Sequence, residues 1–252
     1  MNPKAKRNYL ELTQELADLE VFDPAAFVGT SEWPQEVCDL VLSLAVAYND
    51  VKDLVFAQQL LPLVWPGEGK PTAARGQYSG IHLHLTKLLA GVINELAELM
   101  EKNASARNSG AFLRVIRLLP SEAREAWQAV EAAVAAVGPR SDRFGKLVYY
   151  ARMKVAFHYD RKEIAHGYRL AFTNPAAGPP YVSRGRNMAS TGFYFADAAV
   201  DAYMRNAADA ETAAEFFAAG WEVLKEINHA LREIVLRYVN ARGYGWRNPP
   251  AA

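Results

Sequence analysis

Arginine and histidine side chains at short, regular spacing are the residues of this sequence best suited to acid–base chemistry on a phosphate. Two such pairs lie close together: Arg152 precedes His158 with five residues between them, and Arg161 precedes His166 with four. Histidine titrates near neutral pH and serves as a general acid or base, while an arginine guanidinium stabilises charge on a phosphorane. These groups are suited to metal-independent RNA cleavage, in which a 2′-hydroxyl loses its proton and the leaving 5′-oxygen gains one.

The two pairs resemble the R-x(4–6)-H motif of the HEPN superfamily, named for higher eukaryotes and prokaryotes nucleotide-binding, and the phrase KVAFHYD is similar to bacterial helical proteins of this type. The resemblance implies an all-helical fold and a metal-independent endoribonuclease that needs no cofactor, in a prokaryotic defence or toxin–antitoxin system. Because HEPN ribonucleases usually form a composite site from two protomers, it also implies a homodimer. An antitoxin or other defence-system protein is a further expected partner.

Helical spacing favours Arg152 and His158 over the second pair as catalytic residues. The helix that carries them has an apolar stripe at Phe144, Val148, Ala151 and Val155. At about 100° per residue, His158 lies within roughly 40° of this stripe and Arg152 lies at about 80° on its other edge, so both would border one seam. His166 lies nearly opposite the apolar line of its own helix and is predicted to face solvent. Met153 follows Arg152 where the family often has a polar residue, so a packed histidine beside a salt-bridged arginine is the alternative interpretation.

A basic segment lies within a chain of zero net charge. Residues 140–186 contain ten Lys or Arg and three Asp or Glu, a charge of +7, so the remainder carries −7. Such a zone attracts phosphates, and aromatic rings that interleave with it can stack on bases. The residues predicted to bind substrate are Lys154, Tyr159, Arg161, Arg184 and Arg186. The alternative is a solvated surface whose cations pair with acids elsewhere.

Two E-x-x-H motifs raise a different possibility, a di-metal carboxylate bundle. They are Glu163 to His166 and Glu226 to His229. Glu226 and His229 lie about 130–170° from the apolar stripe of the last helix, whereas ligands of a bundle-core metal must point inward. No metal site is therefore predicted. A non-catalytic helical scaffold, or a module that binds RNA or nucleotide, remains the main alternative to the ribonuclease.

The elements that must position these residues are predicted to be helices. Apolar residues recur at helical spacing along most of the chain and no segment alternates with period two, so the fold class is all-α: a bundle of roughly seven to nine helices in a single domain, 1–252. The motif resemblance implies that this bundle is HEPN-like. The second helix is expected to end at Leu61 before Pro62, and the third to begin near Tyr78. Loops rich in Pro and Gly are predicted at 62–77 and 173–192. Asp160 and Glu163 predict a helix start after Tyr159.

Composition sets the broad class. Half of the residues are hydrophobic and about a fifth are charged, as in globular proteins, and Cys38 is the single cysteine. The longest uncharged apolar run has nine residues, from Leu40 to Tyr48, far short of a membrane span, and no apolar leader is visible near the start. A reducing cytoplasm with no membrane association is therefore expected.

Overall fold

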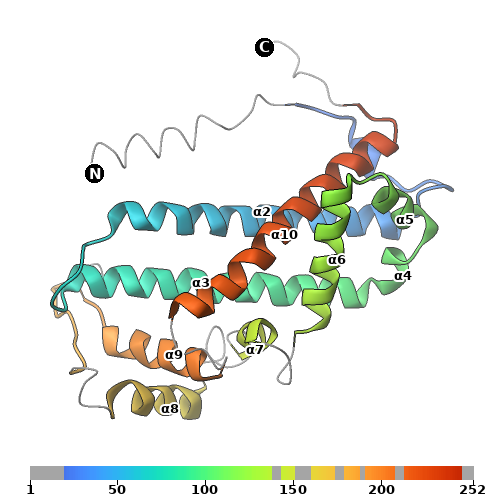
Figure 1. Cartoon of the computed structure of the whole chain (residues 1–252). Helices are drawn as coiled ribbons and strands as arrows, with labels where there is room; N and C mark the ends of the chain where they lie inside the picture. The colour runs from blue at the N-terminus through green and yellow to red at the C-terminus, as the bar shows by residue number, and fades with distance from the viewer. Residues whose placement is uncertain are drawn as a thin grey trace. The chain divides into compact units, whose positions relative to one another are not determined.

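The computed structural model of the chain describes residues 20–137, 143–150, 160–173, 179–187, 191–207 and 213–245, except the side chains of 143, 144, 147 and 213–219. These residues form nine α-helices and two short 3-10 helices and no strand, which confirms the predicted all-α class (Figure 1). The apolar spacing of Tyr9, Leu12, Leu16 and Leu19 predicts a first helix, and these residues lie outside the described part of the chain. In order the elements are η1 Pro24–Phe27, α2 Gln35–Leu60, η2 Leu61–Val64, α3 Ala73–Lys102, α4 Ala104–Arg107, α5 Gly110–Arg117, α6 Ser121–Ala135, α7 Arg143–Tyr150, α8 Arg161–Phe172, α9 Tyr194–Ala207 and α10 Ala213–Ala241.

The residues group into two compact units. Among the described residues, unit 1 contains those within 54–94 and 136–221, and unit 2 contains those within 20–53, 95–135 and 222–245. The boundaries fall inside α2, α3 and α10, so each of these helices contributes to both units. The single domain expected from the sequence stays a prediction.

The start of α3 differs from the sequence prediction. Helix α2 ends at Leu60, within one residue of the expected position, but α3 begins at Ala73 rather than near Tyr78. The hydroxyl of Thr72 accepts a hydrogen bond from the Arg75 backbone N–H at 3.2 Å, and Ala73 opens a stretch with high helix propensity. Arg75 also donates to the carbonyl oxygens of Gly67 and Gly69, which ties the shortened loop to the first turn of the helix.

Unit 2 has its core around Tyr238 of α10. The side chain of Tyr238 is fully buried, and its hydroxyl donates a 2.7 Å hydrogen bond to the carbonyl oxygen of Ala26 in η1. The ring of Trp33 meets it edge to face at 5.5 Å, and the Arg242 guanidinium stacks over the Trp33 ring at 5.9 Å. These contacts fasten the chain segment before α2 to the end of α10.

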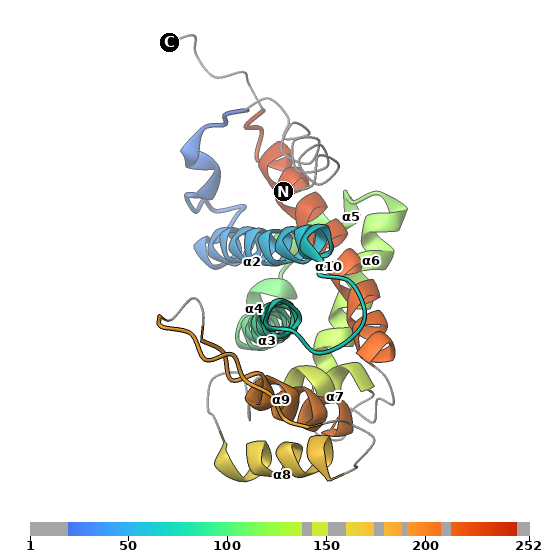
Figure 2. The same cartoon turned by 90° about the vertical axis from the view of Figure 1, so that its left-hand side faces the viewer.

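Unit 1 places α8 directly against α9, and both views show the two helices side by side (Figures 1 and 2). Gly167 of α8 makes this approach possible, because a Cβ there would lie 2.0 Å from the carbonyl oxygen of Ala199. Asp160 is the N-cap of α8, as expected, and its carboxylate accepts from the backbone N–H of Lys162 at 3.0 Å. One buried cluster of this unit consists of Leu83, Ala90, Val200, Tyr203 and Met204.

Candidate functional site

The predicted catalytic pair, Arg152 and His158, lies outside the described residues, as do Lys154 and Tyr159. The described residues on either side contact one core cluster. Tyr150, the last residue of α7, meets the ring of Tyr203 edge to face at 6.5 Å, and Ile164 of α8 packs against the same cluster. Burial raises the pKa of Tyr203, helped by the negative charge of Glu163, so the Tyr203 hydroxyl stays neutral. The segment 151–159 therefore joins two helices that are anchored in unit 1.

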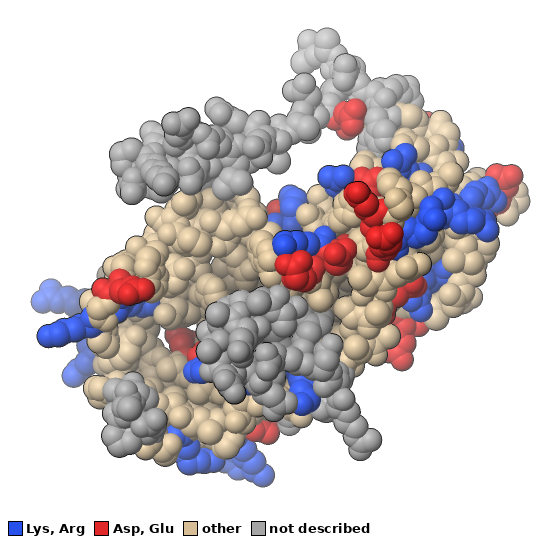
Figure 3. All heavy atoms as spheres, viewed as in Figure 1, with Lys and Arg blue, Asp and Glu red and all other residues tan. Residues whose placement is uncertain are grey.

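Exposed cations lie on α8 and on the loop before α9. We define the cationic face as the five Lys and Arg residues described on α8 and on the loop before α9, all of them exposed and none in an ion pair with an acid in the described part of the chain: Arg161, Lys162, Arg169, Arg184 and Arg186. Blue side chains project at the lower edge of the view, where α8 lies (Figure 3). Three members of this set are predicted substrate-binding residues: Arg161, Arg184 and Arg186.

Backbone hydrogen bonds hold the loop that carries Arg184 and Arg186. Ser183 and Gly192 form an antiparallel bridge with N–H to O distances of 2.8 and 3.0 Å, and the Thr191 hydroxyl donates to the carbonyl oxygen of Gly185 at 3.3 Å. Arg184 directly follows one bridge residue. The bridge thus keeps the start of the arginine pair next to the residues that lead into α9.

His166 is half-buried, so the expectation that it faces solvent is only partly met. The buried side of α8 is centred on Gly167 rather than on the line through Ile164 and Tyr168, and Tyr168 is 39% exposed. The reason is the close approach to α9: a glycine, which contributes no apolar side chain to the sequence pattern, occupies the contact. His166 lies about 100° from Gly167, at the edge of the interface.

A second set of ionisable groups lies between α3 and α9 of unit 1. Burial lowers the pKa of His82, against the opposing effect of Asp201, and Asp201 pairs with Arg205 at 2.9 Å. The His82 ring stacks on Tyr78 at 6.4 Å. Burial likewise raises the pKa of the nearby Asp197 carboxyl, opposed by Lys87 and His84. These groups join α3 to α9, and Arg75, seven residues before His82, is engaged with loop carbonyls rather than with the histidine.

The lowered pKa of His82 predicts a measurable pH dependence of stability. The His82 imidazole binds a proton more tightly in the unfolded state than in the folded state. The stability contributed by neutral His82 is therefore lost as pH falls below about 6.5. We expect His82→Phe, which keeps a ring on Tyr78, to make the decline in unfolding free energy between pH 6.5 and 5 shallower by up to about 1.4 kcal/mol per pH unit. Urea titrations at several pH values measure this. An unchanged slope would contradict the assignment, and the exposed His84→Phe is the control.

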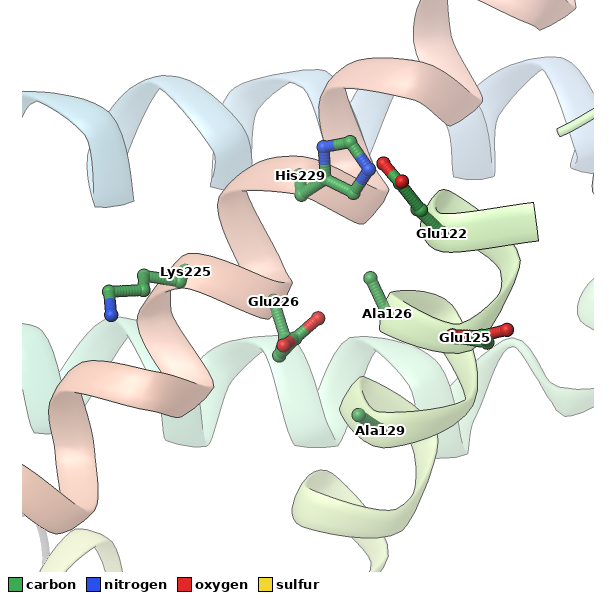
Figure 4. A pocket seen from close by; sticks show the side chains of 7 residues that line it. All are labelled: Glu122, Glu125, Ala126, Ala129, Lys225, Glu226 and His229. Atoms are coloured by element: carbon green, nitrogen blue, oxygen red, sulfur yellow. The ribbon is translucent and has the colours of Figure 1, made fainter. Parts of the chain in front are cut away.

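Unit 2 contains an open groove of about 540 Å³ between α6 and α10. The second E-x-x-H motif lies here: Glu226 and His229 extend from α10 toward α6, and Glu122 extends toward His229 (Figure 4). The predicted orientation is therefore confirmed, because Ile227 and Leu231 are fully buried while Glu226 and His229 are not. Among the described residues no group of three or more His, Cys, Asp or Glu is placed to hold a metal ion. With three glutamates along it, the groove repels a polyanion.

No family model, curated protein or solved structure matches the chain. Within the described ranges, the helices are each too short or too polar to cross a membrane. The exposed residue that sequence reasoning missed is Phe193, which directly precedes α9 and is 62% exposed. Its signal in the sequence was the pattern GFYF next to the loop with Arg184 and Arg186.

Proposed function

We propose that this chain is a HEPN-like, metal-independent endoribonuclease that binds RNA on the cationic face of unit 1. In this proposal Arg152 stabilises the charge on the phosphorane and His158 moves protons between the 2′-hydroxyl and the leaving 5′-oxygen. Lys154 and Tyr159 contact the RNA beside them. The expected setting is a cytoplasmic homodimer in a defence or toxin–antitoxin system, with an antitoxin or other defence-system protein as a partner.

The observation that carries the proposal is the contrast between the cations of the two units. In unit 2, several basic side chains are paired with acids: Arg107 lies 2.9 Å from Glu131, and Arg232 lies 2.8 Å from Glu233. Side chains of both signs gather around α10 in Figure 3. The five residues of the cationic face have no such acids among the described residues. Exposed cations without acidic partners attract a polyanion, which releases its counterions when it binds.

A charge-neutralising variant tests the proposal. We expect Arg161→Gln, Arg169→Gln, Arg184→Gln and Arg186→Gln together to weaken binding of a 20-nucleotide single-stranded RNA by at least about 10-fold at low salt. The slope of log affinity against log salt should fall by about 0.7 for each phosphate that the variant no longer neutralises. Fluorescence anisotropy between 50 and 300 mM salt, about the range over which such slopes are measured, gives both values.

The matched control removes the same amount of positive charge elsewhere. Lys52, Lys102, Arg117 and Lys225 are exposed residues of unit 2, and three of them are paired with acids: Lys52 with Asp53 and Lys102 with Glu98 at 2.8 Å, and Lys225 with Glu222 at 2.7 Å. Their replacement by Gln should leave the slope nearly unchanged. Equal losses of affinity in the two variants would show that RNA responds to net charge alone and would contradict the proposed location.

The alternative, a helical scaffold or RNA-binding module without catalytic activity, is consistent with the same described residues. A cleavage assay distinguishes it from the ribonuclease. A wild-type protein that binds RNA with the expected salt slope, yet leaves it intact in EDTA, would be an RNA-binding module or scaffold. The cationic face accounts for binding in both cases. Cleavage depends on Arg152 and His158.

A further inference from the structure

A row of aromatic rings crosses from α9 to α8 beside the cationic face. Phe193 lies 6.2 Å from Phe195 between ring centroids, Phe195 lies 6.2 Å from Tyr168, and Tyr168 lies 4.9 Å from Phe172. We call these four residues the aromatic row. Phe195 and Phe172 are half-buried, whereas Phe193 is 62% exposed and Tyr168 is 39% exposed.

Local structure holds the exposed end of the row in place. Phe193 follows Gly192, which is bridged to Ser183, and it precedes Tyr194, the first residue of α9, whose side chain is buried. The carbonyl oxygen of Phe193 also accepts from the backbone N–H of Ala196 at 2.8 Å. The ring is therefore presented from a backbone fixed on both sides, so little conformational entropy is lost when something stacks on it.

The positive charge beside the aromatic row indicates which ligand binds there. Arg184 follows the residue bridged to Gly192, next to Phe193, and Arg169 follows Tyr168 on α8. Exposed rings beside arginines that form no ion pair within the described residues match the alternating bases and phosphates of a single strand. In a duplex the base faces are stacked on one another and cannot reach a protein ring. An apolar protein partner would not need the surrounding positive charge.

We propose that the aromatic row stacks on the bases of single-stranded RNA, with Phe193 as the main stacking ring, so that the protein selects single strands over duplexes. This inference rests on the proposed RNA-binding function of the cationic face and names the form of RNA that this face accepts. Arginines set the salt dependence of binding. Phe193 sets the preference for unpaired bases.

The test uses the full-length protein, a 12-nucleotide single-stranded RNA and the duplex of the same sequence. We expect Phe193→Leu, which keeps an apolar side chain, to weaken single-strand binding by roughly 5- to 100-fold with an unchanged salt slope, as expected for loss of one stacked base. Phe193→Tyr should retain the affinity, and Leu170→Ala, at an exposed apolar position on α8, is the control. Circular dichroism of each variant checks that the helices are intact.

A spectroscopic signal separates stacking from a structural role. In Phe193→Trp, the new indole should lose fluorescence when single-stranded RNA is added, beyond the change seen in the wild type, because a stacked base quenches it. Wild-type affinity in Phe193→Leu, or equal quenching of the indole by the duplex, would overturn the inference about stacking. Neither result would contradict the proposal that RNA binds on the cationic face. If the wild type binds neither the single-stranded RNA nor the duplex at low salt, both the proposed function and this inference are wrong.

Discussion

Replacing His158 by alanine is expected to lower the rate of RNA cleavage in EDTA by about 10²–10⁴-fold, the usual contribution of a general acid or base. The physical reason is that His158 carries the proton transfer in the proposed reaction, and no other side chain in this role is proposed. The wild-type products should end in 2′,3′-cyclic phosphates, because the 2′-hydroxyl is the nucleophile. Gel analysis of a labelled RNA, with chemical identification of the product ends, measures the effect.

His166→Ala is the matched control for this change. His166 belongs to the second arginine–histidine pair and is half-buried at the edge of the interface between α8 and α9. Its loss should change cleavage much less than the loss of His158, while RNA affinity stays close to that of the wild type in both variants. Severe loss of cleavage in His166→Ala, with normal cleavage in His158→Ala, would move the catalytic role to the second pair.

Gly167→Ala is expected to destabilise unit 1 by about 3 kcal/mol, near the upper end of the range for overpacked interiors. The added methyl group would lie 2.0 Å from the carbonyl oxygen of Ala199 and 2.8 Å from the Cβ of Tyr203. One of these partners is backbone in the middle of α9, so α8 must move away. Urea denaturation, combined with amide hydrogen exchange of residues 161–172, should show that α8 loses protection first.

Gly110→Ala provides the comparison for the glycine change. Gly110 is the first residue of α5, and a Cβ there would meet nothing within 4 Å. Alanine at this position should stabilise the protein by about 0.4–1 kcal/mol, because it restricts the unfolded chain. A Gly167→Ala variant as stable as the wild type would show that α8 does not depend on the close approach to α9.

Much of the fold could be predicted from the sequence because apolar periodicity records which side of each long helix is buried. Spacing and capping predicted the end of α2 to within one residue of Leu60, the start of α8 after Asp160 and the outward position of Glu226 and His229 on α10. The start of α3 did not follow, because three prolines and three glycines in 62–77 conceal the cap that Thr72 provides.

The candidate site was predictable in part. Charge counting located the basic zone, and in the structure Arg161, Arg184 and Arg186 are exposed. Charge counting could not show which cations pair with acids, since ion pairs depend on tertiary packing. The aromatic row was missed for a similar reason: Phe193 and Tyr168 are 25 positions apart in the sequence and are linked only through the packing of α8 on α9.

Photo-crosslinking tests the central claim, that unit 1 binds RNA on its cationic face, most directly. A single-stranded RNA containing 4-thiouridine is irradiated with the full-length protein at low salt, and the crosslinked peptides are identified by mass spectrometry. Crosslinks should concentrate in peptides from residues 161–172 and 179–195, and Phe193 and Tyr168 should be among the modified residues. Crosslinks confined to α6 and α10, the helices of the acidic groove, or an absence of crosslinks, would contradict the account.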